Sequence, residues 1–263
     1  GYRSKLALTG KGVGRDPYTY QLESYRDHVA AMVQIYRRDL QDELAYVAQR
    51  LAEHPDPDLR VSDGLLDRAV RLALALHDVG KLQVGWQEWA RAYQKRVAGE
   101  EPPFLVAHTL SETEEHRKIA RQVRPRRPHH AGEGALAGAK ILWEALDGRN
   151  NRGLYLATVT AIACHHAPGL DEAAPFRLDP EAGAALAEAL TAAGDSTWRD
   201  WASSLIMEQE APRLEKRLLK MPPDDYWEWW LLYFLIVRAV RLADGKSQKN
   251  NLTTPPDPVP APT

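Results

Sequence analysis

The segment from Leu154 to His166 constrains the fold more than any other part of the sequence, because it is apolar on nearly every face. A helix that is apolar all round must be covered on every side, so this segment predicts a central helix surrounded by others. Pro168 and Gly169 follow it and mark its end. The histidines His165 and His166 stand at the end of this apolar segment, where a buried polar side chain needs a partner.

Apolar residues recur at helical spacing along most of the remaining chain. Further helices are expected over residues 22–50 (as one helix or two), 65–78, 86–97, 135–146, 198–220 and 224–244, and after Pro180. No segment alternates convincingly in the manner of a strand, and no hairpin signal is present. We therefore expect an all-α fold, a helical bundle around a buried central helix.

The composition is that of a soluble globular protein, with 44% hydrophobic and 27% charged residues. The net charge of −2 leaves any contact with nucleic acid to a local basic patch. The single cysteine, Cys164, excludes an intrachain disulfide and a multi-cysteine zinc site. The longest apolar run, residues 229–237, is far shorter than the roughly 20 residues that cross a bilayer. We expect a cytoplasmic protein without a membrane partner.

The domain organisation follows from the two ends of the chain. Residues 1–252 are expected to form one domain, and residues 253–263, with five prolines, a disordered tail or a linker. The chain starts at Gly1, which suggests a tag remnant or a fragment of a longer protein.

Histidines and aspartates gather at the ends of the expected helices. The pairs are His77-Asp78 after an apolar run, His165-His166 after the central segment, and His129-His130 before the helix at 135, with His28 on an early helix and Asp244 near the end of the last one. Each alone has an ordinary explanation, such as a capping aspartate or a packed histidine. Together, imidazoles and carboxylates without cysteine suit a transition-metal site with open positions for water and substrate.

The motif HDVGK at residues 77–81 resembles the signature of the HD-domain metal phosphohydrolases, an all-α superfamily. The longer stretch HDVGKLQVGWQ is followed by HHAGEGA, CHHAPG and RLADG. In this order and spacing, the chain resembles the HD nuclease domain of the CRISPR-associated helicase–nuclease of type I systems. The resemblance covers roughly residues 25–250.

The resemblance implies a set of functional residues. One metal ion would be held by His28, His77, Asp78 and Asp244, and a second would share Asp78 and use His130, His165 and His166. Asp78 and Lys81 would be catalytic, with the ammonium group of Lys81 on the scissile phosphate. The ions would be divalent transition metals, two in number (manganese, nickel, cobalt or iron), with magnesium as a further candidate.

Two positions depart from the family pattern. The third motif reads PHHAGEGA, with Glu133 three residues after His130, and the alignment of the small residues favours His130 over His129 while leaving both open. Leu242 stands where many members have a second aspartate, which leaves Asp244 as the carboxylate of that motif.

The resemblance implies a metal-dependent endonuclease that hydrolyses phosphodiester bonds of single-stranded DNA in CRISPR type I interference. Its partners would be a CRISPR surveillance complex and a helicase on the same or a separate chain, because no GxxxxGK[ST] motif occurs here. One alternative is an HD-type nucleotide or cyclic-nucleotide phosphohydrolase. Another is an interaction module with a degenerate site.

A basic segment, RKIARQVRPRR at residues 117–127, leads directly into His129-His130. Its six cations could guide a phosphate backbone, and the alternative is a solvated arginine-rich loop. Trp86 and Trp89 could stack on unpaired bases or belong to the core. The core is favoured for Trp89, and both remain open for Trp86.

Overall fold

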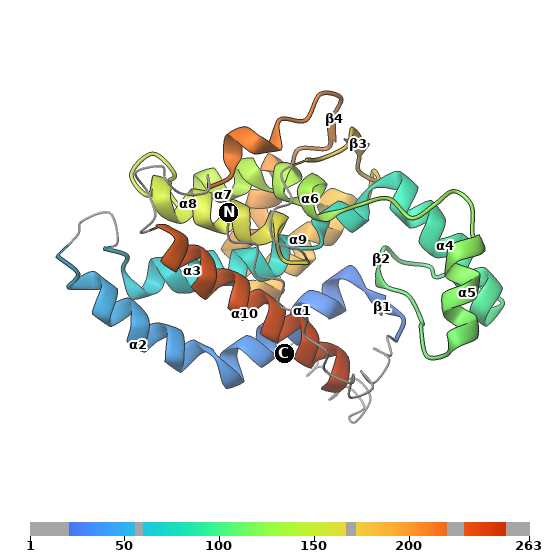
Figure 1. Cartoon of the computed structure of the whole chain (residues 1–263), viewed down its shortest axis with the longest axis horizontal. Coiled ribbons are helices and arrows are strands. Elements are labelled where there is room, and N and C mark those ends of the chain that lie inside the picture. The colour runs from blue at the N-terminus through green and yellow to red at the C-terminus, as the bar shows by residue number, and fades with distance from the viewer. Residues whose placement is uncertain (1–20, 56–59, 167–171, 220–228, 251–263) are drawn as a thin grey trace, which may run out of the picture.

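The computed structural model describes residues 21–55, 60–166, 172–219 and 229–250, and most of these residues are helical (Figure 1). The α-helices are α1 (Tyr25–Asp39), α2 (Gln41–Ala52), α3 (Asp63–Leu76), α4 (Val84–Ala98), α5 (Glu114–Gln122), α6 (Ala131–Ala137), α7 (Ala139–Ala145), α8 (Arg152–Ala163), α9 (Ala182–Ala193) and α10 (Trp229–Asn250). Three 3-10 helices join them: η2 (Val79–Leu82), η3 (Ser196–Ser204) and η4 (Leu214–Arg217).

The central helix is α8, as its apolar faces predict. Its residues from Gly153 to Ala163 are buried except for Leu156. It packs against α10, α6 and α3. The prediction of an all-α bundle around a buried helix is confirmed.

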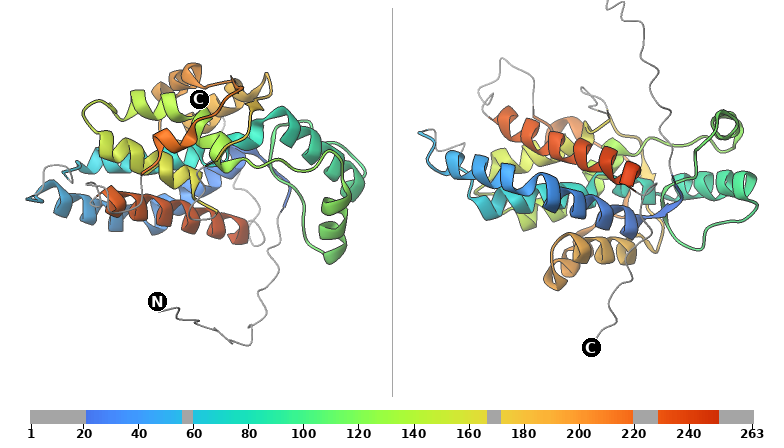
Figure 2. Two further views of the ribbon diagram at one scale, coloured as in Figure 1. Left: turned by 45° about the horizontal axis from the view of Figure 1, so that its top comes forward. Right: turned by 90° about the horizontal axis from the view of Figure 1, so that it is seen from below.

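The helices from the two ends of the described chain lie side by side. α10 packs along α8 and α1, and α1 also packs against α9 (Figure 2). The start of α1 is fixed by Ser24, whose hydroxyl accepts a hydrogen bond from the Asp27 backbone N–H, as a helix N-cap should. This arrangement brings residues from the first and last helices to one place in the core.

In the described part of the chain, four short strands form two small sheets, which were not predicted from the sequence. β1 (Glu23–Ser24) pairs antiparallel with β2 (Val106–His108), and β3 (Phe176–Arg177) pairs antiparallel with β4 (Glu208–Gln209). Strands of two or three residues are too short to show alternation, so the periodicity test does not detect them.

The prediction of one helix over residues 198–220 is wrong. Within the described part of that range the chain forms η3, β4 and η4. Asp195 accepts a hydrogen bond from the Thr197 backbone N–H and starts η3. Pro212, which has no N–H to donate, lies in the middle of the range and interrupts any continuous helix.

α4 and α5 project from one side of the bundle and have a small core of their own (Figures 1 and 2). Trp86 and Trp89 are 2% and 3% exposed within it, so both belong to the core and neither presents a face for base stacking. The basic segment begins within α5, so its first part is helical.

Within the described residues, no helix has the length and apolar composition needed to cross a bilayer. The proline-rich segment 253–263 lies outside the described residues.

Candidate metal centre

Asp78 stands at the centre of a cluster of histidines. α3 ends at Leu76, and His77 and Asp78 follow before η2 begins. Asp78 is 1% exposed. Its Oδ2 atom lies 3.2 Å from His77 Nε2, and its Oδ1 atom lies 3.1 Å from His130 Nε2. The two carboxylate oxygens therefore face two different groups of nitrogen donors, as a carboxylate that bridges two cations must.

The first group faces the Oδ2 atom of Asp78 and comprises His28, His77 and Asp244. His28 Nε2 lies 3.7 Å from Asp78 Oδ2 and 3.6 Å from Asp244 Oδ1. One donor atom from each residue of this group lies within 4.8 Å of the others. The members come from α1, the end of α3 and α10, so the packing of α10 beside α1 assembles this group.

The second group comprises Asp78, His130, His165 and His166, again with donor atoms within 4.8 Å of one another. The Nε2 atoms of His130 and His166 are 2.9 Å apart, and His165 Nε2 lies 3.7 Å from Asp78 Oδ1. Two nitrogens bound to one ion at about 2.1 Å are themselves separated by about 3 Å, so this spacing fits a shared cation.

The alternatives at the third motif separate clearly in space. His130 lies in the cluster, whereas His129 is exposed and its carbonyl accepts a hydrogen bond from Gln83 Nε2 at 2.7 Å. Glu133 lies outside the donor groups and accepts a hydrogen bond from the Ala174 backbone N–H.

Backbone carbonyls orient two of the imidazoles. His77 Nδ1 lies 3.0 Å from the Leu74 carbonyl oxygen, and His165 Nδ1 lies 2.6 Å from that of Ile162. Each Nδ1–H donates to its carbonyl, which leaves the Nε2 lone pair for the cluster.

Several buried polar atoms of the cluster have no hydrogen-bond partner. They include Nε2 of His28, Nε2 of His77, Nε2 of His165 and Oδ1 of Asp78. Buried polar groups are normally paired because leaving them unpaired costs about 1–3 kcal/mol each. A set of convergent lone pairs without protons to share is what a divalent cation satisfies, so these residues fit the metal that the donor set suggests.

Burial and charge set the pKa values of the cluster. Burial lowers the pKa of His130 to about 4 and that of His166 to about 3. Burial alone would raise the pKa of Asp78, but the charges of His77 and Lys81 hold it well below its usual range. Burial alone would raise the pKa of Asp244 as well, but the charges of His28, His77 and His108 together lower it. At neutral pH Asp78 and Asp244 are therefore carboxylates, and His130 and His166 are neutral imidazoles, which are the protonation states that bind metal.

His77 is the exception. Burial acts to lower its pKa, but the adjacent Asp78 carboxylate outweighs burial and raises it. A cation at this position would displace that proton, because a ligating imidazole must be neutral.

Lys81 lies beside the cluster rather than at the surface. Its Nζ atom is 2.5 Å from Asp78 Oδ2, and the residue is 6% exposed. Lys81 is therefore not an ordinary surface lysine, although it lies in the short helix η2 just after the end of α3.

Two glycines let the motifs approach each other. A Cβ atom on Gly80 would lie 2.0 Å from the His130 carbonyl oxygen, and one on Gly134 would lie 2.9 Å from the Gly80 nitrogen. The HDVGK turn and the start of α6 are thus in backbone contact, which sets His130 against Asp78.

The structure adds two residues that the sequence analysis missed, Glu23 and His108. They face each other across the β1–β2 pair, with His108 Nδ1 3.1 Å from Glu23 Oε2. Together with His28 they form a third group of possible metal donors. No motif marks them in the sequence, because only the pairing of two very short strands places them here.

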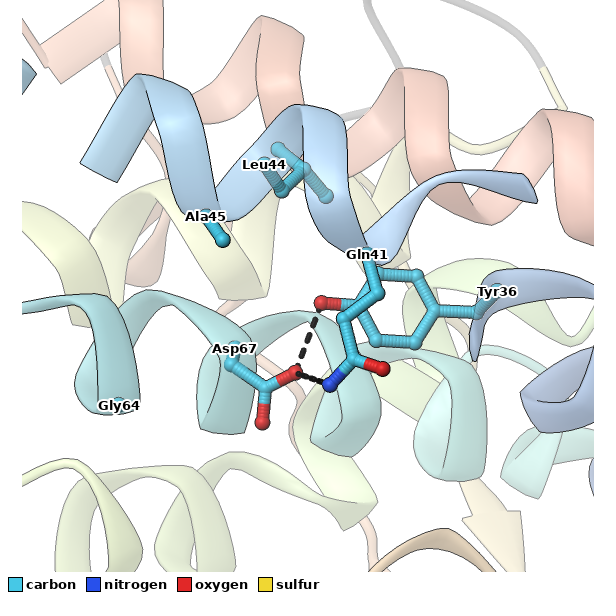
Figure 3. Close-up of a pocket in the computed structure, with 6 residues that line it drawn as sticks. All are labelled: Tyr36, Gln41, Leu44, Ala45, Gly64 and Asp67. Carbon is cyan, nitrogen blue, oxygen red and sulfur yellow. Dashed lines mark hydrogen bonds between the residues drawn. The ribbon is translucent and has the colours of Figure 1, made fainter. Parts of the chain in front are cut away.

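A small hollow of about 150 Å³ lies between α1, α2 and α3, lined in part by Tyr36, Gln41 and Asp67 (Figure 3). The Tyr36 hydroxyl and the Gln41 amide both donate to Asp67 Oδ1, and the Arg71 guanidinium binds Asp67 Oδ2. All of these groups are paired, so the hollow is a structural junction and not a second site.

Comparison with protein families gives the class of this fold and site. The model of the family described as "Cas3, HD domain" matches residues 24–237, most of the chain. The chain therefore belongs to the Cas3 HD-domain family, and the expected resemblance is confirmed. Its general kind is a metal-dependent HD hydrolase of a CRISPR system. No curated protein and no solved structure gave a significant match.

Proposed function

We propose that this chain is a metal-dependent endonuclease that hydrolyses single-stranded DNA during CRISPR type I interference. The observation that carries the proposal is the convergence of buried, unpartnered donor atoms on the two oxygens of Asp78. Bound there, two divalent transition-metal ions would polarise the scissile phosphate and activate a water molecule. Manganese, nickel, cobalt or iron suits a donor set this rich in imidazole, and magnesium suits it less.

Each residue of the cluster has a role in this proposal. Asp78 would contact both ions. His28, His77 and Asp244 would hold one ion, and His130, His165 and His166 would hold the other, in agreement with the groups of donor atoms described above. The unpartnered Nε2 atoms of His77 and His165 point to the same assignment.

Lys81 is proposed to bind the phosphate. Its ammonium group lies on Asp78 Oδ2, the oxygen that would bind a cation. Once a cation neutralises Asp78, the ammonium no longer has its partner, and its flexible stem lets it turn to a phosphate oxygen.

The basic segment supports a polyanionic substrate. Arg121, Arg124, Arg126 and Arg127 are exposed, and the segment leads along the backbone directly to His130. A strand that follows these side chains would reach the cluster, with an affinity that falls as salt rises.

The partners follow from the family. A helicase on the same or another chain would supply single-stranded DNA, and a CRISPR surveillance complex would deliver the target. We further propose that residues 1–252 form the nuclease domain and that residues 253–263 are a tail or a linker.

A cleavage assay on circular single-stranded DNA tests the proposal, because a circle has no ends and only an endonuclease can open it. The assay compares manganese, nickel, cobalt and magnesium with a chelator, using the parent chain and Asp78→Asn. The matched control is Asp42→Asn, at an exposed position on α2. Metal-dependent opening of the circle that Asp78→Asn abolishes and Asp42→Asn retains is the expected result.

Two results would overturn the proposal. Intact circles under every metal, with hydrolysis of mononucleotides or cyclic nucleotides, would make the chain a nucleotide phosphohydrolase. Intact circles with no metal bound by the parent chain would make it an interaction module.

A further inference from the structure

Glu23 contacts two imidazoles through one oxygen atom. Its Oε2 atom lies 3.1 Å from His108 Nδ1 and 3.3 Å from His28 Nδ1. The two rings are 4.2 Å apart, edge to face. The other nitrogens of both rings face Asp78, with His108 Nε2 3.9 Å and His28 Nε2 3.7 Å from its Oδ2 atom.

This is the arrangement in which a carboxylate orients histidines for a metal. A carboxylate that accepts from Nδ1–H fixes the tautomer and ring orientation, and the Nε2 lone pair then points to the ion. One carboxylate oxygen has the lone pairs to accept from two imidazoles. Glu23 is therefore placed to orient His28 and His108 through their Nδ1 atoms. The backbone carbonyls of Leu74 and Ile162 orient His77 and His165 in the same way.

The strand that carries His108 is held firmly in place. The amide of Gln87, which is fully buried, donates to the carbonyls of Lys81 and Val106 and accepts from the Val106 backbone N–H at 2.9 Å. This clamp fastens β2 to the turn that follows Asp78, so His108 keeps its place beside the cluster.

We propose that His108 is an additional ligand of the ion held by His28, His77 and Asp244, and that Glu23 is the positioning residue for both His28 and His108. This inference rests on the metal centre of the proposed function. A third imidazole would make this ion's donor set nitrogen-rich and favour a transition metal over magnesium, which prefers oxygen.

Cobalt binding tests the role of His108 independently of activity, because the visible spectrum of Co²⁺ reports its ligands. The metal-free protein would be titrated with Co²⁺ while its visible absorbance is recorded. Calorimetry of the same titration would give the affinity for each ion. The variants are His108→Gln and Glu23→Gln, and the control is His116→Gln on α5, which lies outside the donor groups. Circular dichroism without metal establishes that each variant folds. If His108→Gln does not fold, His108→Asn replaces it.

The expected result is that His108→Gln changes the cobalt spectrum and lowers the affinity for one of the two ions at least about tenfold. The affinity for the other ion should not change. Loss of the orienting carboxylate in Glu23→Gln is expected to weaken the same ion by roughly 10- to 100-fold. Parental spectra and affinities in both variants would overturn the inference while leaving the proposed function intact. If the parent chain binds no cobalt, that result would instead contradict the proposed function itself.

A second, independent observation concerns a hollow of about 920 Å³ at the opposite end of α8. Among the residues that line it are five cations and no carboxylate: Arg149, Arg152, Arg213, Lys216 and Arg217. All five are exposed. Trp143, which is 44% exposed, and Tyr155 also line the hollow.

These cations have no anionic partner within the described part of the chain. Within the described residues, one side-chain hydrogen bond involves these cations, from the Arg217 guanidinium to the Tyr155 hydroxyl at 3.1 Å. Five like charges around one hollow repel one another, and a chain of phosphates relieves that repulsion. An exposed tryptophan at its edge supplies a surface on which an unpaired base can stack.

We infer that this hollow binds a stretch of single-stranded DNA, the substrate of the proposed function. α8 begins at Arg152 beside the hollow and ends just before His165 in the cluster. Twelve helical residues span about 18 Å, so one strand can occupy both places.

Fluorescence anisotropy with a labelled oligothymidine tests this site in the cleavage-deficient Asp78→Asn background. The variant is Arg149→Glu with Arg152→Glu, and the matched control is Arg37→Glu with Arg50→Glu, which reverses the same number of exposed charges elsewhere. The expected result is at least about tenfold weaker binding and a shallower salt dependence for the first pair alone. Equal affinities for the two pairs would overturn the inference, whether or not the parent chain cleaves DNA.

Discussion

Burial keeps the imidazoles of His108 and His130 neutral, because it lowers the pKa of each to about 4. Both side chains are mostly buried, at 9% and 13% exposed. A histidine in the unfolded chain titrates near 6.5, so on acidification the unfolded state takes up protons before the folded state does.

This difference predicts that the metal-free protein loses stability as the pH falls from about 6.5 to about 4. Each of the two histidines contributes a slope of up to about 1.4 kcal/mol per pH unit in that window. The pKa of His77 is raised, so its effect lies above this pH window. The stability that its proton contributes is lost as the pH rises through the pKa of the folded state. Urea unfolding with a chelator present, at a series of pH values, measures the slope. His130→Gln should give a shallower slope, and parallel slopes would contradict the assignment.

At the level of single residues, the sequence was sufficient to predict that the histidines and aspartates of the recognisable motifs lie close together. His77-Asp78 and His165-His166 follow apolar helices, and the structure brings them together with His28, His130 and Asp244. Glu23 and His108 could not be found in this way. Their proximity depends on the pairing of two strands of two and three residues, which leaves no periodic trace in the sequence.

The elements of the site are locked together by close backbone contacts. Gly80 lies so close to the His130 carbonyl that any side chain at position 80 must push α6 away. Gly80→Ala is therefore expected to cost about 1–3 kcal/mol of unfolding free energy and to weaken metal binding at the His130 group. Chemical denaturation and cobalt titration measure the two effects.

The control for this change is Gly64→Ala on α3, where a Cβ atom meets nothing within 4 Å. Alanine there should be neutral or slightly stabilising, because it removes the conformational entropy of glycine. Equal effects of the two substitutions would mean that the contact between the HDVGK turn and α6 does not position His130.

Asp67 of α3 joins three helices, and Figure 3 shows its hydrogen bonds to Tyr36 of α1 and Gln41 of α2. Tyr36 of α1, Gln41 of α2 and Arg71 of α3 all donate to its carboxylate. Asp67→Ala should cost about 2–3 kcal/mol of unfolding free energy, because a partly buried carboxylate and its donors lose their hydrogen bonds. Cleavage per folded molecule should not change. A parental melting curve would show that these bonds contribute nothing.

At the level of elements, the α-helices with a strong apolar pattern could be predicted from the sequence. The 3-10 helices and the short strands could not. α8 follows from its apolar composition, whereas the range 198–220 has helical spacing but folds as 3-10 helices around Pro212. The division of the segment 135–146 into α6 and α7 was missed as well, since Gly138 separates two helices that share one apolar pattern.

For the whole molecule, binding of cations should raise stability, because the donor groups exist only in the folded state. Manganese or cobalt at about one hundred times its dissociation constant should add about 2.7 kcal/mol to the unfolding free energy. Thermal melting with and without metal measures this shift. Asp78→Asn should show no shift, and an equal shift in that variant would place the binding elsewhere.

The placement of α10 against α1 has a consequence for how the protein matures in the cell. His28 and Asp244 meet at one ion site although roughly two hundred residues separate them in the sequence. During synthesis, the histidines of α1 and α8 emerge from the ribosome long before α10 does. A nascent chain that lacks α10 would therefore lack Asp244, one of the proposed metal ligands. The proposed donor set would be complete only after α10 has docked against α1.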